Sequence, residues 1–430
     1  MTEAFTAAFP GALDELYVAY EQVPFFGKHL DAAGLTPDDI QTADDFRRVP
    51  PTAKPDYRRN FPAGVLVRGA TLNDPFIFKS RSSGTTGDRL LTVAHTFTLA
   101  GRMTATTSVH PGLLKVFADA KEQRVCRYAP PNCSDVECAT PFTTPQTRTL
   151  PDGTLVLPVA HDLLATPDVM VRQAVDELTD YGPHWLYVDP QHLAFLVRAM
   201  RRQGIPAPAV GGIVLTYNVV AATSRRQIAE FFADTAPVTV EVASMSEMGW
   251  LGMECPHGFL HLNAESFYLE LLPEGDGPTR PAVPGELAEL YVTSIGDELS
   301  PHIRYRTGDL YTLVDGDCPC GHAFPRVVHQ GRREDVMRAG DGGVLLTPKQ
   351  LDELVGPARW LDVYKLRQLA PGRFQFRYVP AEGEPDDSLG GKLRDVLSSN
   401  PSTDLTFEAV DYIECERSGK FLPCISEVPL

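Results

Sequence analysis

The middle of the chain alternates short apolar segments with amphipathic helices, and this pattern constrains the fold more than any other feature of the sequence. The periodicity of the apolar residues predicts helices over residues 166–179, 191–203 and 223–233. Apolar runs of strand length predict strands over residues 185–188, 212–215 and 238–242. Strands that alternate with helices of roughly ten to fifteen residues are typical of βαβ units and a mostly parallel sheet. We therefore expect an α/β fold here.

The segments on either side differ from this central part. Residues 1–60 predict helices with polar breaks, and residues 96–118 predict a helix interrupted near Pro111. Further along the chain, strands at 267–272 and 289–293 come without long helices between them. This change indicates a β-rich subdomain.

The end of the chain predicts a separate small domain. A strand over residues 374–379 and a helix over 389–397 indicate an α+β arrangement. We place the boundary at residues 331–335, where the character of the chain changes. The predicted architecture is a large N-terminal domain over residues 1–331, with parallel βαβ sheets and the β-rich subdomain, and a small mobile C-terminal domain over 335–430.

Charge and composition exclude several classes of protein. The 430 residues carry 39 basic and 56 acidic side chains, a net charge of -17, which argues against non-specific nucleic-acid binding. Met1 is not followed by a basic segment and an apolar core, so we expect no signal peptide. Apolar runs such as residues 211–215 are too short to span a bilayer. We expect a cytoplasmic protein without nucleic-acid or membrane partners, in which clustered cysteines indicate metal rather than disulfides.

One segment rich in glycine and hydroxyl side chains is suited to binding phosphate. It consists of Ser82, Ser83, Gly84, Thr85, Thr86 and Gly87. Glycines let backbone N–H groups turn towards a ligand, and the hydroxyls add further donors. The segment lacks the Gly-Lys-Ser/Thr ending of a Walker A loop. By itself it could also be a flexible linker.

Three later segments add polar candidates. Asp309, in a glycine-containing turn, could accept hydrogen bonds from two ribose hydroxyls, although a turn aspartate is more often an Asx-turn or a helix cap. Residues 331–335 contain two arginines, and Lys420 follows a glycine near the C-terminus. Alone, such a lysine is usually a solvated charge.

Together, these four segments resemble, in order and spacing, the adenylate-forming superfamily of acyl- and aryl-CoA ligases. The resemblance is closest to the phenylacetate–CoA ligase-like branch and covers the chain from about Val49 onward. The motif at residues 245–249, which includes Glu247, is similar to the acidic motif of that family. The resemblance implies an enzyme that uses ATP and Mg²⁺ to adenylate a small-molecule acid.

The resemblance also implies roles for single residues of the ATP site. Thr85 and Thr86 would hold the β- and γ-phosphates, and Glu247 would coordinate Mg²⁺. Asp309 and Arg332 would hold the ribose hydroxyls.

Two further roles concern the small domain. Lys420 would bridge the acyl carboxylate and the α-phosphate, so that Thr86, Glu247 and Lys420 are the implied catalytic residues. Glu334 would lie at the hinge about which the small domain rotates.

Two departures from the family pattern weaken the expectation about the substrate. Asp88 and Arg89 follow the phosphate segment where the family has Lys-Pro, so Arg89 is a candidate local cation. Residues 243–244 are Ala-Ser where the family has Tyr-Gly, and Tyr217 is a candidate for lining the adenine site in place of the missing aromatic ring.

Cysteines and histidines in two segments indicate a zinc site. Cys318 and Cys320 form a Cys-x-Cys knuckle, and Cys255 and His261 lie upstream. Three thiolates and an imidazole would complete a tetrahedral structural site. His257 competes with His261 as the nitrogen ligand, and free cysteines beside ordinary histidines are the alternative.

The acid is expected to bind near Tyr128, Asn132, Trp185 and Tyr187. Trp185 and Tyr187 alternate along one strand and so share a face, although core packing explains this equally well. The polar groups of Tyr128 and Asn132 suggest an aromatic acid with a hydroxyl or amino substituent.

Three functions follow as alternatives. The first is activation of an acid as an acyl-adenylate and its transfer to the thiol of CoA or of a carrier-protein phosphopantetheine arm. The second is adenylation of another oxyanion, such as nitrite, for N–N bond formation with an arylamine (diazotase-type chemistry). The third is a non-catalytic nucleotide-binding relative. The oligomeric state stays open, with a homodimer as one alternative.

Overall fold

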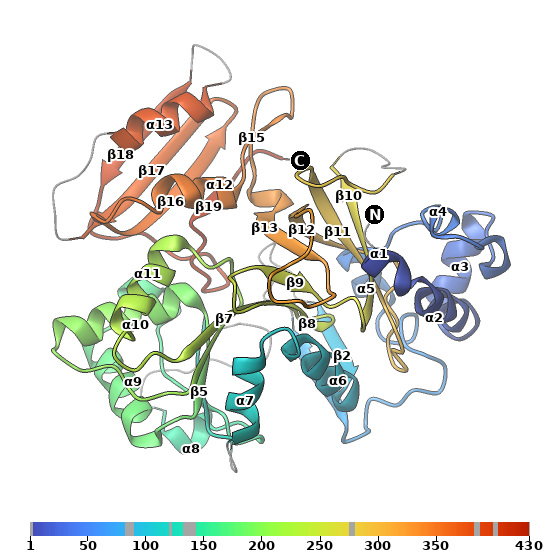
Figure 1. Ribbon diagram of the computed structural model, residues 1–430, viewed down its shortest axis with the longest axis horizontal. Coiled ribbons are helices and arrows are strands. Elements are labelled where there is room, and N and C mark those ends of the chain that lie inside the picture. The colour runs from blue at the N-terminus through green and yellow to red at the C-terminus, as the bar shows by residue number, and fades with distance from the viewer. Residues whose placement is uncertain are drawn as a thin grey trace. The chain divides into compact units, whose positions relative to one another are not determined.

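The computed structural model describes residues 3–81, 90–119, 123–131, 143–274, 280–381, 388–398 and 403–429 (Figure 1). The chain forms two compact units, each built from two separate segments. Unit 1 comprises residues 1–114 and 242–329, and unit 2 comprises residues 115–241 and 330–430. This division into two units differs from the predicted domain boundary at residues 331–335, which stays a prediction. No helix within the described ranges is long and apolar enough to cross a membrane.

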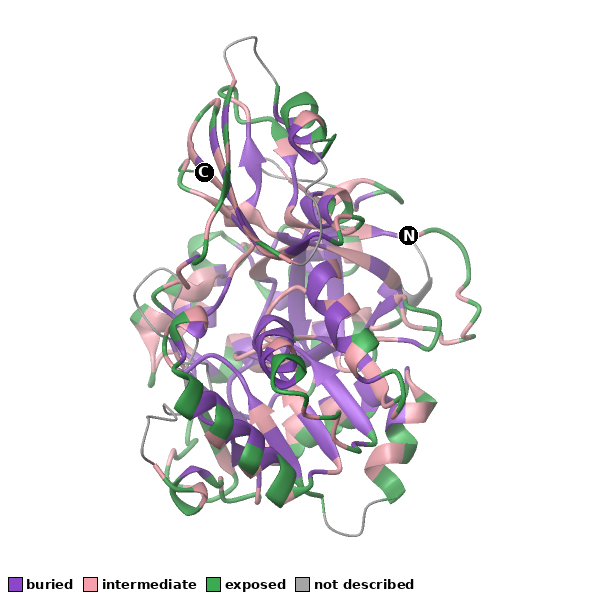
Figure 2. Cartoon of the chain, turned by 90° about the vertical axis from the view of Figure 1, so that its left-hand side faces the viewer, coloured by how far each residue is buried: buried purple, intermediate pink, exposed green. Residues whose placement is uncertain are grey.

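Unit 2 contains the predicted βαβ units. Its parallel strands lie in the order β4 (Leu155–Val156), β3 (Val125–Tyr128), β5 (Trp185–Val188), β6 (Gly212–Leu215) and the first half of β7 (Val238–Met245). The helices between them are α9 (Asp168–Tyr181), α10 (Pro190–Arg202) and α11 (Ala222–Phe231). The predicted alternation is confirmed. Apolar residues of these strands and helices form one buried core, in which α10 is buried along most of its length, whereas α9 also carries exposed residues (burial is coloured in Figure 2).

Local sequence signals explain where these helices begin and end. Asp189 caps α10 by accepting hydrogen bonds from the backbone N–H groups of Gln191 and His192, and Pro190 occupies the first turn. Helix α9 ends at Gly182, whose left-handed φ of 54° suits glycine. The cap of α10 places its N-terminus at the carboxyl ends of β3 and β5.

The C-terminal segment of unit 2 has its own sheet and core. A four-stranded sheet has the order β18 (Asp404–Ala409), β17 (Arg373–Pro380), β16 (Leu361–Ala370) and β19 (Cys424–Ser426). Helices α12 (Pro348–Val355) and α13 (Ser388–Leu397) pack with it, and a short hairpin of β14 (Met337–Arg338) and β15 (Val344–Leu346) precedes them. The predicted α+β character of this segment is confirmed.

Unit 1 combines N-terminal helices with the β-rich part of the chain. The helices are α1 (Glu3–Ala7), α2 (Phe9–Gln22), α3 (Pro24–Ala32), α4 (Ala43–Phe46), α5 (Lys54–Asn60) and α6 (Thr96–Thr107). After a break, α7 (Pro111–Asp119) begins in unit 1 and continues into unit 2. From the second half of β7, the strand order is β8 (Gly249–Glu254), β9 (Leu260–Leu262), β13 (Arg326–Arg332), β12 (Tyr305–Leu313), β11 (Leu287–Ser294) and β10 (Phe267–Pro273). Both the interrupted helix and the β-rich part are confirmed.

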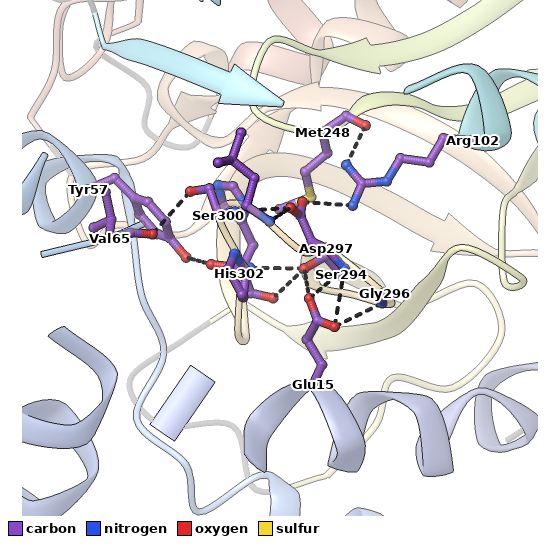
Figure 3. Close-up of polar contacts among 12 residues, drawn as sticks. Glu15, Tyr57, Val65, Arg102, Met248, Ser294, Gly296, Asp297, Ser300 and His302 are labelled. Carbon is purple, nitrogen blue, oxygen red and sulfur yellow. Dashed lines mark hydrogen bonds and ion pairs between the residues drawn. The ribbon is translucent and has the colours of Figure 1, made fainter. Parts of the chain in front are cut away.

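A network of buried charges lies at the centre of unit 1 (Figure 3). The Glu15 carboxylate accepts hydrogen bonds from Ser294 Oγ and from the backbone N–H groups of Gly296 and Asp297. Burial and the nearby Asp297 charge raise the pKa of Glu15 to about 7. Arg102 on α6 pairs with Asp297 at 3.0 Å and donates a hydrogen bond to the Met248 carbonyl. The network therefore holds the residue next to Glu247.

His302, in the same network, is expected to make folding sensitive to acid. Its ring stacks on Tyr57 with centroids 4.4 Å apart, and burial lowers its pKa from 6.5 to about 4. Below pH 6.5 the unfolded chain binds a proton that the folded ring excludes. The stability from this group is therefore complete above pH 6.5, and about 3 kcal/mol is lost as the pH falls towards 4.

Urea unfolding of the wild type and His302→Phe between pH 4 and pH 8 measures this contribution. Phenylalanine keeps a ring for stacking on Tyr57 but has no titrating group. The wild-type unfolding free energy should fall more steeply with acid than that of the variant. If the unfolding free energies of the two proteins changed with pH in parallel, His302 would not be the source of the acid sensitivity.

Candidate active site

The predicted phosphate segment, residues 82–87, lies outside the described residues, as do Asp88 and Arg89, but the strands that flank it are described. Strands β1 (Ile77–Arg81) and β2 (Leu91–His95) pair as an antiparallel hairpin in which Arg81 is opposite Leu91. The Thr92 hydroxyl lies 2.6 Å from the Ser80 hydroxyl and 3.1 Å from the carbonyl oxygen of Ser246. The described flanks of the segment, at Ser80 and Thr92, are therefore held beside the acidic motif.

Glu247 occupies the tight turn between β7 and β8. Met245 is paired with Gly249 across this turn, and Gly249 has a left-handed φ of 79°. The Glu247 side chain is 5% exposed and accepts a hydrogen bond of 3.0 Å from Tyr305 Oη. Lys54 Nζ lies 3.7 Å from the same carboxylate oxygen. A buried, oriented carboxylate beside the flanks of the phosphate segment fits a ligand of a phosphate-bound Mg²⁺.

Asp309 lies on the same strand as Tyr305, at an irregularity in the sheet. The pairing of β11 with β12 shifts register between Glu289 and Tyr291, and Gly308 has a φ of 76°. Such bulges redirect side chains and are common beside functional sites. The Asp309 backbone N–H donates to the Thr307 hydroxyl. Strand β12 therefore carries both the partner of Glu247 and the predicted ribose ligand.

In unit 2, Tyr217 and Lys420 meet at the carboxyl end of β6. Tyr217 has a positive φ of 74°, which is uncommon for a non-glycine residue and marks a constrained backbone. Lys420 is 7% exposed, and its ammonium donates a hydrogen bond of 2.7 Å to the Tyr217 carbonyl oxygen. The tyrosine predicted for the adenine site and the predicted catalytic lysine are thus brought together.

Arg332 and Glu334 lie at the start of the C-terminal segment of unit 2. Their side chains form an ion pair at 3.7 Å, and each is 42% exposed, so the pair contributes little to stability. The preceding Gly331 has a φ of 104°, and a Cβ atom there would lie 2.4 Å from Pro348. Glycine is therefore required where the chain enters the predicted hinge.

The residues predicted for the acid pocket lie on two faces of the sheet. Tyr128 is paired with Val188 and belongs to the helix-covered core, whereas Tyr187 is paired with Arg127 and lies on the opposite face. The Trp185 indole donates to Gln123 at the amino end of β5. Asn132 lies outside the described residues. The pocket assignment stays a prediction.

Three residues near Glu247 were given no role from the sequence, and one of them is Lys54, 3.7 Å from its carboxylate. Tyr305 lies within the motif containing Asp309 but was given no role, and Arg102 was not singled out. A lone arginine on an apolar helix face is the signal that could have pointed to Arg102, since a buried charge requires a partner.

The four predicted zinc ligands lie together in unit 1. The ligand atoms of Cys255, His261, Cys318 and Cys320 are all within 4.8 Å of one another. The sulfur atoms of Cys255 and Cys318 are 3.8 Å apart, and Cys320 Sγ lies 3.5 Å from His261 Nε2. A tetrahedral Zn²⁺ with Zn–S bonds of about 2.3 Å places two sulfur ligands about 3.8 Å apart. The donor set and these spacings fit zinc.

The surroundings of His261 favour it over His257. His261 Nδ1 lies 2.8 Å from the Phe324 carbonyl oxygen, so that Nδ1–H donates and Nε2 is left for a metal. Burial lowers the pKa of His261, which favours the neutral imidazole that binds metals. His257 is exposed in the β8–β9 turn and is not part of the cluster.

Comparison with known proteins identifies the relatives of this chain. No protein-family model matches it. Phenylacetate-coenzyme A ligase of Escherichia coli (strain K12) is 26% identical over 366 residues, which span 82% of this chain and 74% of that protein. The enzyme of the same name from Aromatoleum evansii is 26% identical over 384 residues, spanning 86% and 80%. This chain is similar to phenylacetate-coenzyme A ligases.

A solved structure supports the fold of this chain. A 2-hydroxyisobutyryl-CoA ligase in the postadenylation state, in complex with R3-HIB-AMP, matches it with a TM-score of 0.69 at 16% identity. The match covers 95% of this chain and 87% of that chain. This chain therefore has the fold of that CoA ligase. The resemblance inferred from the sequence and the predicted α/β fold class are confirmed.

Proposed function

We propose that this protein is an ATP-dependent ligase that activates a carboxylic acid as an acyl-adenylate and transfers the acyl group to a thiol. The observation that carries the proposal is the contact between Lys420 and the Tyr217 carbonyl. The two residues are 203 positions apart in sequence, and the contact brings a buried cation to the carboxyl end of a parallel strand. Ligands of α/β folds bind at this edge of the sheet.

The chemistry assigns separate tasks to the charged residues. The acid carboxylate attacks the α-phosphorus of ATP, and pyrophosphate leaves. The Lys420 cation stabilises the negative charge that accumulates between the carboxylate and the α-phosphate. Glu247, oriented by Tyr305, would hold the Mg²⁺ that neutralises the phosphates. Asp309 and Arg332 would bind the ribose hydroxyls, and residues 82–87 the β- and γ-phosphates.

The class of substrate is proposed from the names of the relatives and not from the shape of a cavity in the structure. Both curated relatives are named phenylacetate-coenzyme A ligases, which supports an aromatic acid and CoA as the thiol. The phosphopantetheine arm of a carrier protein is the alternative thiol acceptor. Location in the cytoplasm and a homodimer stay predictions.

ATP–pyrophosphate exchange across a panel of acids tests this function. We expect exchange with phenylacetate, benzoate or their hydroxy and amino derivatives, and thioester formation when CoA is added. Exchange with nitrite alone, followed by coupling to an arylamine, would favour the N–N bond-forming alternative. ATP binding without exchange for any acid or for nitrite would indicate a non-catalytic relative and contradict the proposal.

We also propose that the Cys₃His cluster holds a structural Zn²⁺. With four protein ligands it has no open position for a substrate, which argues against catalysis by the metal. The metal would join the β8–β9 hairpin to the connection between β12 and β13. Since β12 carries Tyr305 and Asp309, the zinc would indirectly stabilise the strand that contributes to the ATP site.

A further inference from the structure

Lys420 lies in the loop between β18 and β19, residues 410–423, which turns tightly just before the lysine. The Gly419 N–H donates to the Glu416 carbonyl, and the Glu416 N–H donates to the Lys420 carbonyl at 2.9 Å. Gly419 has a left-handed φ of 79°, and a Cβ atom there would lie 3.1 Å from Pro131. The position of the Lys420 backbone therefore depends on where Glu416 is held.

Lys365 of β16 holds this loop from inside the C-terminal segment. Its side chain is 1% exposed, and Nζ donates hydrogen bonds to the Glu414 carbonyl oxygen and, at 2.9 Å, to Glu416 Oε1. The ammonium also lies 4.9 Å from the centre of the Phe421 ring. One buried cation thus contacts residues on both sides of Lys420.

A neighbouring strand adds a second attachment. Arg377 of β17 is directly opposite Lys365 in the sheet, and its guanidinium donates to Glu414 Oε2 at 2.7 Å and to the Tyr412 carbonyl oxygen at 3.0 Å. Arg377 therefore fixes the beginning of the loop, whereas Lys365 reaches its middle. Of these two cationic side chains, it is Lys365 whose described hydrogen bonds include one to Glu416, the residue that is hydrogen-bonded to the Lys420 backbone.

Burying an ammonium group is costly unless its hydrogen bonds are satisfied. A methionine of similar length would pack at the same place without this cost, so stability alone does not explain a lysine here. Its hydrogen bonds give a reason for a lysine at this position, because they hold Glu414 and Glu416 of the loop in place. We propose that Lys365, through Glu416, is a positioning residue that sets the place of the Lys420 ammonium during adenylation; this inference rests on the proposed function.

The substitution Lys365→Met tests the inference by separating the two half-reactions. Misplacing a catalytic group by about 1 Å can cost on the order of 100-fold in rate. We expect the acid-dependent ATP–pyrophosphate exchange rate to fall by about this factor. Thioester formation from synthetic phenylacetyl-adenylate and CoA needs no attack on ATP, so it should stay within about threefold of wild type.

Leu393→Ala is the matched control for general destabilisation of this segment. Leu393 is fully buried on α13 in the core of the C-terminal segment and makes none of the loop contacts described above. We expect this variant to lose stability without lowering exchange selectively. An equal fall of both half-reactions in Lys365→Met, or exchange within threefold of wild type, would overturn the inference.

Hydrogen–deuterium exchange gives a readout that does not need the acid to be known. In Lys365→Met the amides of Glu416 and Gly419 should exchange faster, while those of α13 stay protected. Unchanged protection of both loop amides would also overturn the inference. Absence of pyrophosphate exchange in the wild type with every acid would instead refute the proposed function. The amide exchange of Glu416 and Gly419 would then still test whether Lys365 holds the loop in place.

Discussion

Lys420→Ala is expected to lower acyl-adenylate formation by at least 10²- to 10³-fold, the range seen when one group that stabilises transition-state charge is removed. In unit 2 the ammonium is held against the Tyr217 carbonyl, a position that depends on the tight turn at Gly419. Its charge matters most when negative charge develops between the attacking carboxylate and the α-phosphate. ATP in the ground state keeps its other contacts, so its dissociation constant should change by only a few fold.

Pyrophosphate exchange and equilibrium ATP binding, measured on the same preparations, separate these two effects. The control is Lys392→Ala, which removes an exposed lysine from α13 in the same segment. Lys392→Ala should retain wild-type exchange. Full exchange activity in Lys420→Ala would refute the proposed mechanism. A large loss of ATP affinity in this variant would show that Lys420 acts mainly in ATP binding rather than in catalysis.

Cys320→Ser is expected to release zinc and to destabilise unit 1 by several kcal/mol, because structural zinc sites contribute their binding free energy to folding. The purified wild type should contain about one equivalent of zinc, as expected for one four-ligand site, and the variant well under one. Cys320 Sγ lies 3.5 Å from His261 Nε2, so its loss opens one edge of the ligand tetrahedron. Elemental analysis and thermal unfolding with and without a chelator measure both effects.

Two matched pairs of variants make this test specific. Cys126→Ser changes a buried thiol of unit 2 that is outside the cluster, and its zinc content should equal that of the wild type. His261→Asn should lose zinc, whereas His257→Asn should keep it. A wild-type protein with well under one equivalent of zinc would count against the site.

Several parts of this protein could be predicted from local sequence. The period of the apolar residues identified α9, α10, β5 and β6, because side chains one turn or two residues apart share a face whatever the rest of the chain does. The Pro111 break between α6 and α7 is equally local, since proline begins a helix but does not continue one. The order of the four motifs was enough to identify the relatives.

Other features were decided by the tertiary structure. Cys255 and Cys318, which meet in the Cys₃His cluster, are 63 residues apart in the sequence. Lys365 is 51 residues from Glu416, and Arg102 is 146 residues from Met248. Which of these groups meet depends on strand order and register, which act over the whole chain and have no local periodicity.

The same distinction applies to the acid pocket and to the four motifs. The sequence by itself placed Trp185 and Tyr187 on one face of a strand, but only the register with β3 put Tyr128 on the other face. By itself the sequence also predicted the fold class and the resemblance to CoA ligases, which rests on the phosphate, acidic, ribose and lysine motifs. Only the tertiary structure decided that His261 joins the cysteines and that Lys420 reaches Tyr217, because a long-range contact is fixed by how strands and loops pack.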